Sequence, residues 1–83
     1  MAIDYSKLRS LTARKLVLAL KKDGFSLVRQ SGSHKIFRHP DRRRVTVSFH
    51  KGGQTFPIKL LKIMIEEQAK WNEKDLKRLS ILK

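Results

Sequence analysis

The sequence predicts an α+β domain in which helices pack on one face of a three-stranded antiparallel sheet. Three observations predict it: apolar residues recur at helical spacing before Gly24, alternate with polar residues between Phe25 and His50, and return to helical spacing after Pro57. Because helices and strands repeat with different periods, this pattern predicts one helix, three strands and two further helices. The 83 residues leave room for a single domain with a modest core.

The first predicted helix follows a short N-terminal arm, residues 1–11, whose structure the sequence does not determine. Thr12 suits the N-cap position, because its hydroxyl can accept a hydrogen bond from a free N–H group of the first turn. Gly24 follows two lysines and an aspartate and is expected to end the helix, since glycine readily adopts the left-handed C′ conformation. Between them, four apolar residues form one helical face: Ala13, Leu16, Val17 and Leu20.

Three strands are predicted over residues 25–30, 33–38 and 45–50. Between the first two, Gly32 can take a positive φ, and we expect the chain to bulge there and to expose its backbone to a ligand. Pro40 lies in a turn between the second and third strands. In the third strand, apolar and polar residues alternate, which predicts one buried and one wet face: Val45, Val47 and Phe49 against Thr46, Ser48 and His50.

The second predicted helix has Pro57 in its first turn, where the missing N–H group costs nothing. One stripe of this helix follows Ile58, Leu61, Ile65 and Gln68 and is thickened by Leu60, Met64 and Ala69. Apolar residues extend well round the helix, so we expect it to be the main core element. Asn72 and Asp75 resemble a capping box that opens a short last helix, with Leu76 and Leu79 facing inward. Residues 1–83 thus form one domain, divided into the arm (1–11), a core (12–70) and a C-terminal helical extension (71–83).

Positive charge is the strongest global signal in the composition. Twenty Lys and Arg stand against seven Asp and Glu, a net charge of +13. Lys and Arg that meet phosphates release condensed counterions, so nucleic acid or another polyanion is the expected partner. Solubility alone needs far less charge. A membrane surface is the rival partner, because part of residues 12–22 can be drawn as a basic amphipathic helix.

Several function classes are disfavoured by what the sequence lacks. No cysteine is present, which excludes disulfides, thiolate catalysis and cysteine-based zinc sites. The longest apolar run, residues 16–20, is too short for a signal peptide or a membrane span, so we expect a cytoplasmic protein. The acids show no motif for two cations, and there is no glycine-rich phosphate loop. We therefore expect neither a metal nor another cofactor.

The chemistry is expected in the strand region, where an antiparallel sheet should bring the three histidines and many basic residues together on one face or edge. The imidazole of His34 can take a proton from a ribose 2′-OH or donate one to a leaving oxygen near neutral pH. A lone strand histidine is more often a surface or hydrogen-bonded residue, and any single arginine here is as readily a solvated one. The predicted RNA-binding residues are Gly32, Ser33, Lys35, Arg38, Arg42, Arg43, Arg44 and His50.

Two of these candidates also have possible catalytic roles. Lys35 or Arg38 could stabilise the charge that grows on the phosphorus. Spacing alone makes His50 a candidate for the second proton transfer. The third histidine, His39, has no role assigned from the sequence.

The order of these motifs resembles the HicA family of mRNA interferases. The resemblance runs from about Thr12 to near Gln68 and rests on Gly24-Phe25, Arg29-Gln30-Ser31-Gly32-Ser33-His34, Arg38-His39-Pro40-Asp41 and Arg43-Arg44-Val45-Thr46-Val47. The chain departs from the family at two places. Ser48-Phe49 stands where the family commonly has Pro after Val-Thr-Val, and Phe56-Pro57-Ile58 replaces the usual Gly-Thr start of the second helix.

The resemblance implies a double-stranded-RNA-binding-domain-like fold and a role as the toxin of a type II toxin–antitoxin pair. Members of the family cleave mRNA without metal and are neutralised by the antitoxin HicB. The family's catalytic histidine, in its Gly-Ser-His motif, falls on His34. We therefore expect a monomeric, metal-independent endoribonuclease that has RNA and a HicB-type antitoxin as partners and does not bind membranes.

Two alternatives remain open from the sequence. The first is a non-catalytic RNA-binding module of the same fold, in which His34 only contacts a phosphate. The second is a DNA-binding regulator that reads a groove with its first helix. It is less favoured because that helix carries basic residues but few of the Asn and Gln residues that read base edges.

Overall fold

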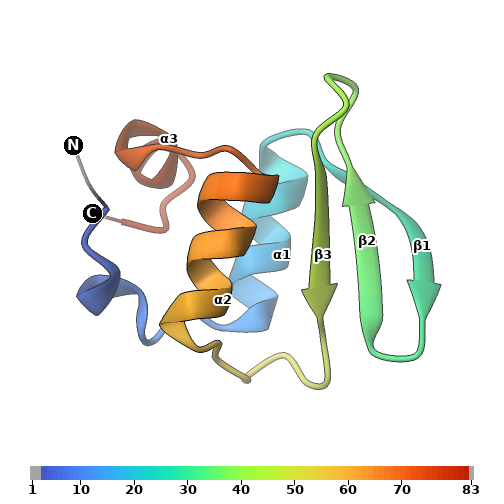
Figure 1. Cartoon of the computed structure of the whole chain (residues 1–83), viewed down its shortest axis with the longest axis horizontal. Helices are drawn as coiled ribbons and strands as arrows, with labels where there is room; N and C mark the ends of the chain where they lie inside the picture. Colours follow the sequence, from blue (N-terminus) through green and yellow to red (C-terminus); the bar gives the residue numbers. More distant parts are fainter. Residues whose placement is uncertain (1–2, 83) are drawn as a thin grey trace.

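The computed structural model describes residues 3–82 and contains an antiparallel sheet with strand order β1-β2-β3 and with helices on one face (Figure 1). Its elements are η1 (Tyr5–Leu8), α1 (Ala13–Lys22), β1 (Ser26–Ser31), β2 (His34–Arg38), β3 (Arg44–Ser48), α2 (Ile58–Lys62), η2 (Ile63–Gln68) and α3 (Glu73–Arg78). Here η1 is a 3₁₀ turn, and η2 continues α2 as a π-helix. The predicted α+β, double-stranded-RNA-binding-domain-like arrangement is confirmed.

Helix α1 begins and ends where the local sequence predicts. The Thr12 hydroxyl accepts a hydrogen bond from the Lys15 N–H group at 3.3 Å and so caps the helix. Gly24 follows the helix with a φ of +105°, and a Cβ atom at this position would lie 2.9 Å from the His39 imidazole. Backbone conformation and close packing therefore both require glycine here.

The β1–β2 hairpin has a two-residue loop, Gly32 and Ser33, because Ser31 pairs with His34. Gly32 has the predicted positive φ, +58°, which suits the first central residue of a tight hairpin turn. The bulge predicted at Gly32 is wrong, because a two-residue loop leaves no extra residue there. The register shifts instead at Val28, on the exposed strand at the edge of the sheet.

The predicted strands have the right order, and their ends differ from the observed ones by one or two residues. The largest difference is in β3, which ends at Ser48 rather than at His50. Beyond Ser48, the Gln54 side chain forms hydrogen bonds with the backbone in place of a neighbouring strand. Its Nε2 donates to the Ser48 carbonyl at 2.7 Å, and its Oε1 accepts from the Lys51 N–H group at 3.0 Å. These bonds turn the chain out of the sheet.

The core lies between the helices and one face of the sheet. On this face, three side chains are at most 1% exposed: Phe37, Val45 and Val47. The alternation in β3 predicts the burial of the two valines. Apolar residues of the two long helices complete the cluster: Leu16, Leu20, Leu61, Met64 and Ile65. Among residues 3–82, no helix is long and apolar enough to cross a membrane.

The second helical segment differs from the prediction at its start and in its later turns. Pro57 is the N-cap residue and precedes α2, rather than lying in its first turn. In η2 the Ala69 N–H group donates to the Met64 carbonyl at 2.8 Å, a π-type bond five residues back. The Gln68 side chain then reaches β3, where its Oε1 accepts from the Thr46 N–H group at 3.0 Å. This contact gives a partner to one backbone N–H group of the edge strand β3.

The two terminal segments belong to the same core. Tyr5 and Leu8 of η1 are buried, so the arm is ordered over its described residues and packs against the helices. At the other end, the predicted capping box is confirmed, with two reciprocal 2.9 Å bonds between Asn72 and Asp75. The inward residues of this last segment are Trp71, Leu76 and Leu79.

Candidate nucleic-acid interface

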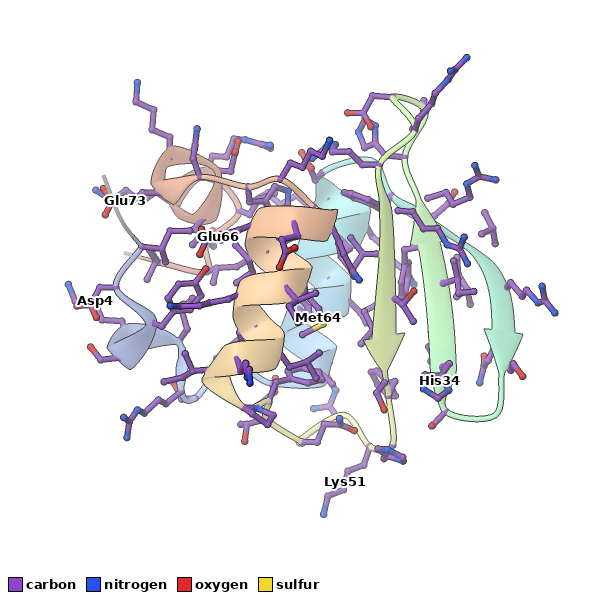
Figure 2. All side chains as sticks on the ribbon, in the orientation of Figure 1. Asp4, His34, Lys51, Met64, Glu66 and Glu73 are labelled. Atoms are coloured by element: carbon purple, nitrogen blue, oxygen red, sulfur yellow. The ribbon has the colours of Figure 1, made fainter. Side chains whose placement is uncertain are left out.

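The face of the sheet turned away from the helices is open and carries basic side chains. The strand registers place three rows of neighbours across it: Ser31, His34 and Ser48; Arg29, Ile36 and Thr46; Ser26, Arg38 and Arg44. The histidine and the three arginines are exposed. None of the three strands contains an acidic residue. In Figure 2, Asp4, Glu66 and Glu73 lie on the helical side of the molecule, away from His34.

His34 lies at the start of β2, directly after the hairpin turn. The Phe49 N–H group donates to the Ser33 carbonyl at 2.7 Å, which makes His34 and Ser48 a non-hydrogen-bonded pair across the two strands. Side chains of such pairs approach most closely, with Cβ atoms about 4.5–5.5 Å apart. Within residues 3–82, the His34 imidazole has no hydrogen bond or ion pair, so both ring nitrogens are free to meet a ligand.

The loop that follows β3 brings His50 to the same end of the sheet. The Ser48 hydroxyl lies 3.2 Å from His50 Nε2, within hydrogen-bond distance. Gln54 Oε1 accepts from the His50 N–H group and holds the loop backbone. Helix α1 supports the loop from below, because its Ala13 and Arg14 N–H groups donate to carbonyls of Gln54 (2.8 Å) and Gly52 (3.0 Å). This loop, with Lys51 at its tip, lies at the same end of the molecule as His34 in Figure 2.

His39 does not join the other two histidines, contrary to the prediction. It follows β2 at the opposite end of the strand, and five residues of extended chain separate it from His34 by roughly 16 Å. Its Nε2 donates to the Asp23 carbonyl at 2.9 Å, and its Nδ1 accepts from the Asp41 N–H group at 3.1 Å. The ring also packs edge-on against Phe25. His39 therefore fastens the β2–β3 turn to the end of α1.

Arg43 is held inside the protein by partners from three segments. Its guanidinium contacts Asp23 at 3.1 Å and Asp41 at 2.7 Å, donates to the Ala69 carbonyl at 2.6 Å and lies over the Phe25 ring. Only 18% of its side chain is exposed. Of the three consecutive arginines, Arg44 shares the open face with Arg38, and Arg42 lies exposed in the turn with a φ of +80°.

Asp23 is the centre of this ionic cluster, and its side chain is only 6% exposed. Besides Arg43, it binds the Trp71 Nε1–H group at 2.8 Å and Arg78 at 2.6 Å. Burial by itself raises the pKa of a carboxyl group, but these hydrogen bonds and the two arginine charges outweigh burial and hold the pKa of Asp23 below its usual value. The cluster ties the C-terminal segment and the β2–β3 turn to α1.

Neither of the two side chains predicted to stabilise charge on the phosphorus lies beside the His34 imidazole in the folded protein. Lys35 points to the helix-facing side of the sheet, where its Nζ lies 4.1 Å from the centre of the Phe49 ring. Arg38 shares the face of His34 but lies at the far end of β2. Arg29 is closer, because it pairs with Ile36 and is the diagonal neighbour of His34, at about 7–8 Å.

A family model described as the HicA toxin of bacterial toxin–antitoxin matches residues 13–71. The chain belongs to the HicA toxin family. Comparison of the chain with individual curated proteins gives no match. The HicA match runs from the start of α1 through the whole sheet to Trp71, so it contains both His34 and His50.

For a HicA protein, the Gly-Ser-His motif now has a structural explanation. Gly32 supplies the positive φ of the turn, Ser33 completes the loop, and His34 is the first residue of β2. The turn is short and the next residue is already paired on both sides, so the backbone of His34 is held rigidly while its side chain stays exposed.

Sequence reasoning gave no role to Ser48 or Gln54, and it placed Arg29 only within the basic cluster of the strand region. A signal existed for Ser48, since the alternation in β3 already puts it on one face with His50. Its place opposite His34 depends on the β2–β3 register. Gln54 had no local signal, because its partners are backbone groups of a loop that forms only in the folded chain.

Two further features bear on the chemistry. In the described part of the chain, residues 3–82, no group of three or more His, Asp or Glu side chains could hold a metal ion. A groove of about 320 Å³ lies between η1, α1 and the C-terminal residues, lined by Leu8, Leu11, Leu18 and Ile81 among others, and none of its lining residues belongs to the sheet. This groove therefore lies apart from the residues around His34.

Proposed function

We propose that this HicA-family toxin is a metal-independent endoribonuclease that cleaves mRNA in the cytoplasm, with His34 transferring a proton. One observation carries the proposal: the His34 imidazole is exposed, has no hydrogen-bond partner among residues 3–82, and lies on a paired strand in a sheet face that holds arginines and no carboxylate. Imidazole changes its protonation state near neutral pH, as a general acid or base must.

RNA is expected to lie along the open face of the sheet. Three exposed arginines, Arg29, Arg38 and Arg44, follow His34 towards the other end of the strands and can contact successive phosphates. Contacts to phosphate and 2′-OH groups suit a protein that reads RNA by shape and backbone. Arg42 can add a contact from the turn. Arg43, engaged with Asp23 and Asp41, is not expected to contribute one.

The proposed reaction is attack of a ribose 2′-oxygen on the adjacent phosphorus. The 2′-O–H bond breaks, a bond from O2′ to phosphorus forms, and the bond from phosphorus to O5′ breaks. The products are a 2′,3′-cyclic phosphate and a free 5′-OH. His34 takes the proton from the 2′-OH or donates one to O5′. The guanidinium of Arg29 can stabilise the negative charge on the phosphoryl oxygens.

A toxin of this kind needs a protein that neutralises it. Membership of a toxin–antitoxin family supports an antitoxin partner, and we propose that this partner is of the HicB type. The net charge of +13 favours an acidic partner surface, because charge complementarity speeds association. The toxin is proposed to be monomeric when free.

Chelation separates this mechanism from metal-assisted cleavage. Purified protein is expected to cut RNA at an unchanged rate in excess EDTA and to leave cyclic or 3′-phosphate ends, because imidazole and guanidinium groups need no cation. End-group analysis of a labelled oligonucleotide measures this. Loss of activity in EDTA that returns with Mg²⁺ would contradict the mechanism. RNA that is bound but never cut would favour the non-catalytic binding module.

Salt dependence tests which arginines meet phosphate. The double variant Arg38→Ala/Arg44→Ala is expected to lower the slope of log Kd against log salt by about 1.4, since each phosphate contact to single-stranded RNA contributes about 0.7. The matched control is Lys59→Ala/Lys74→Ala, which removes two exposed charges from the helical side. Equal slopes for the two double variants would mean that RNA does not follow the open face.

A further inference from the structure

We infer that His50 is the second proton-transfer group of this site and that the Ser48 hydroxyl positions it beside His34. The inference rests on the proposed cleavage of RNA at His34. It adds geometric support for His50, which spacing alone makes a candidate, and it assigns a positioning role to Ser48.

The reaction needs two proton transfers on opposite sides of the phosphorus. One group removes the 2′-OH proton while another protonates the departing O5′, and one imidazole cannot do both in the same step. Among residues 3–82, the charged and titratable side chains at this end of the sheet, besides His50, come from the hairpin, the loop and α1. They are His34 and Arg29 on the open face, Lys35 on the helix-facing side over the Phe49 ring, Lys51 of the loop, and Arg14, whose guanidinium lies against Gly52. The strands and the loop contain no carboxylate. His50 is therefore the group that can exchange a proton near neutral pH.

The register of the sheet puts Ser48 between the two imidazoles. Ser48 faces His34 in a non-hydrogen-bonded pair, the closest arrangement of side chains across two strands. On its other side, its hydroxyl shares a 3.2 Å hydrogen bond with His50 Nε2. Since a hydroxyl both donates and accepts, it can keep this bond whichever state the ring has.

The backbone around His50 is also held in place. The Gln54 amide accepts from the His50 and Lys51 N–H groups and donates to the Ser48 carbonyl, so one side chain spans the loop. The loop in turn rests on the first turn of α1 through two backbone hydrogen bonds. The backbone of the loop is therefore held, whereas the His50 side chain is exposed to solvent.

The two imidazoles start a turnover in opposite protonation states. The neutral ring takes the 2′-OH proton, and the charged ring gives its proton to O5′, so the pair as a whole neither gains nor loses a proton. After product release, exchange with water restores the starting states. A pair of this kind gives a bell-shaped dependence of rate on pH, with one arm from each ring.

An RNA with sulfur in place of the bridging O5′ tests this division of roles, because a thiolate leaves without being protonated. On ordinary RNA, His34→Ala and His50→Ala are each expected to lose roughly a hundredfold to ten-thousandfold in rate and one arm of the pH profile. On the sulfur substrate, the cleavage rate of one variant is expected to recover to within about tenfold of the wild-type rate, while the other variant stays slow. The residue replaced in the variant that recovers is the general acid that protonates O5′. RNA affinity and melting temperature are measured for each variant.

The positioning role of Ser48 is tested by removing its hydroxyl in one variant and keeping a hydroxyl in another. Ser48→Ala is expected to slow cleavage of ordinary RNA about tenfold and to shift the arm of the pH profile that His50 supplies, while Ser48→Thr restores both. The matched control is Ser10→Ala, an exposed serine on the helical side. If His50→Ala keeps the wild-type rate and both arms while His34→Ala is inactive, the inference fails and the proposed function stands. If His34→Ala itself cleaves normally, the proposed function fails.

Discussion

Replacing His34 by alanine is expected to slow RNA cleavage by roughly a hundredfold to ten-thousandfold, because the variant loses a proton transfer in the transition state. RNA affinity should change little, since arginines on the same face supply the phosphate contacts and remain in place. The melting temperature should also be unchanged, because the imidazole is exposed and has no hydrogen-bond partner within residues 3–82. Single-turnover rate, affinity and melting temperature are measured on the same preparation.

His34→Gln is the matched control for this prediction. The glutamine amide can still form hydrogen bonds at that position, but it cannot carry a proton at neutral pH. It is expected to be as slow as the alanine variant. A glutamine variant that keeps most of the wild-type rate would show that His34 acts as a phosphate contact and that another group performs the chemistry.

Replacing Asp23 by alanine is expected to cost about 3–5 kcal/mol of unfolding free energy, because two arginines and the Trp71 N–H group lose a shared, buried partner. For a domain of this size, such a loss lowers the melting temperature by at least about 12 °C. Glu67→Ala is the control, since it removes the same charge from an exposed position. Equal melting temperatures for the two variants would contradict a structural role of the cluster.

The stability from Asp23 should also depend on pH. The pKa of this carboxyl is lower in the folded protein than its unfolded value of 3.8. Its contribution is therefore fully present above about pH 4 and is lost as the pH falls through the folded pKa. The wild-type protein should lose stability in this acid range, and Asp23→Ala should lose less of it. Because the cluster lies at the opposite end of the sheet from His34, the cleavage rate per folded molecule should not change in this variant.

The ends of α1, the start of α3 and the two faces of β3 were determined by the sequence alone. The caps at Thr12, Gly24 and Asn72 act through backbone groups within a few residues, and the alternation along β3 needs only the strand geometry. The motif around Gly32 and His34 is similarly local, which explains why the positive φ of the turn follows from a few consecutive residues.

The sheet register and the partners of each basic residue were decided only by the tertiary structure. Arg43 and Arg44 are neighbours in the sequence, yet one is engaged with Asp23 and Ala69, which lie 20 or more residues away, and the other faces solvent beside Arg38. Successive strand residues point to opposite faces, so a one-residue difference in position decides between the core side and the open face.

The same physical reason separates the three histidines. Their spacing in the sequence does not reveal that β2 runs away from His34 and leaves His39 at the far end, or that β3 returns His50 to the near end. The N-terminal arm is a further case, because Tyr5 and Leu8 fold only against helices formed later in the chain. Local hydrogen bonding and periodicity are encoded residue by residue, whereas the composition of the site depends on contacts between segments distant in sequence, which exist only once the sheet has paired.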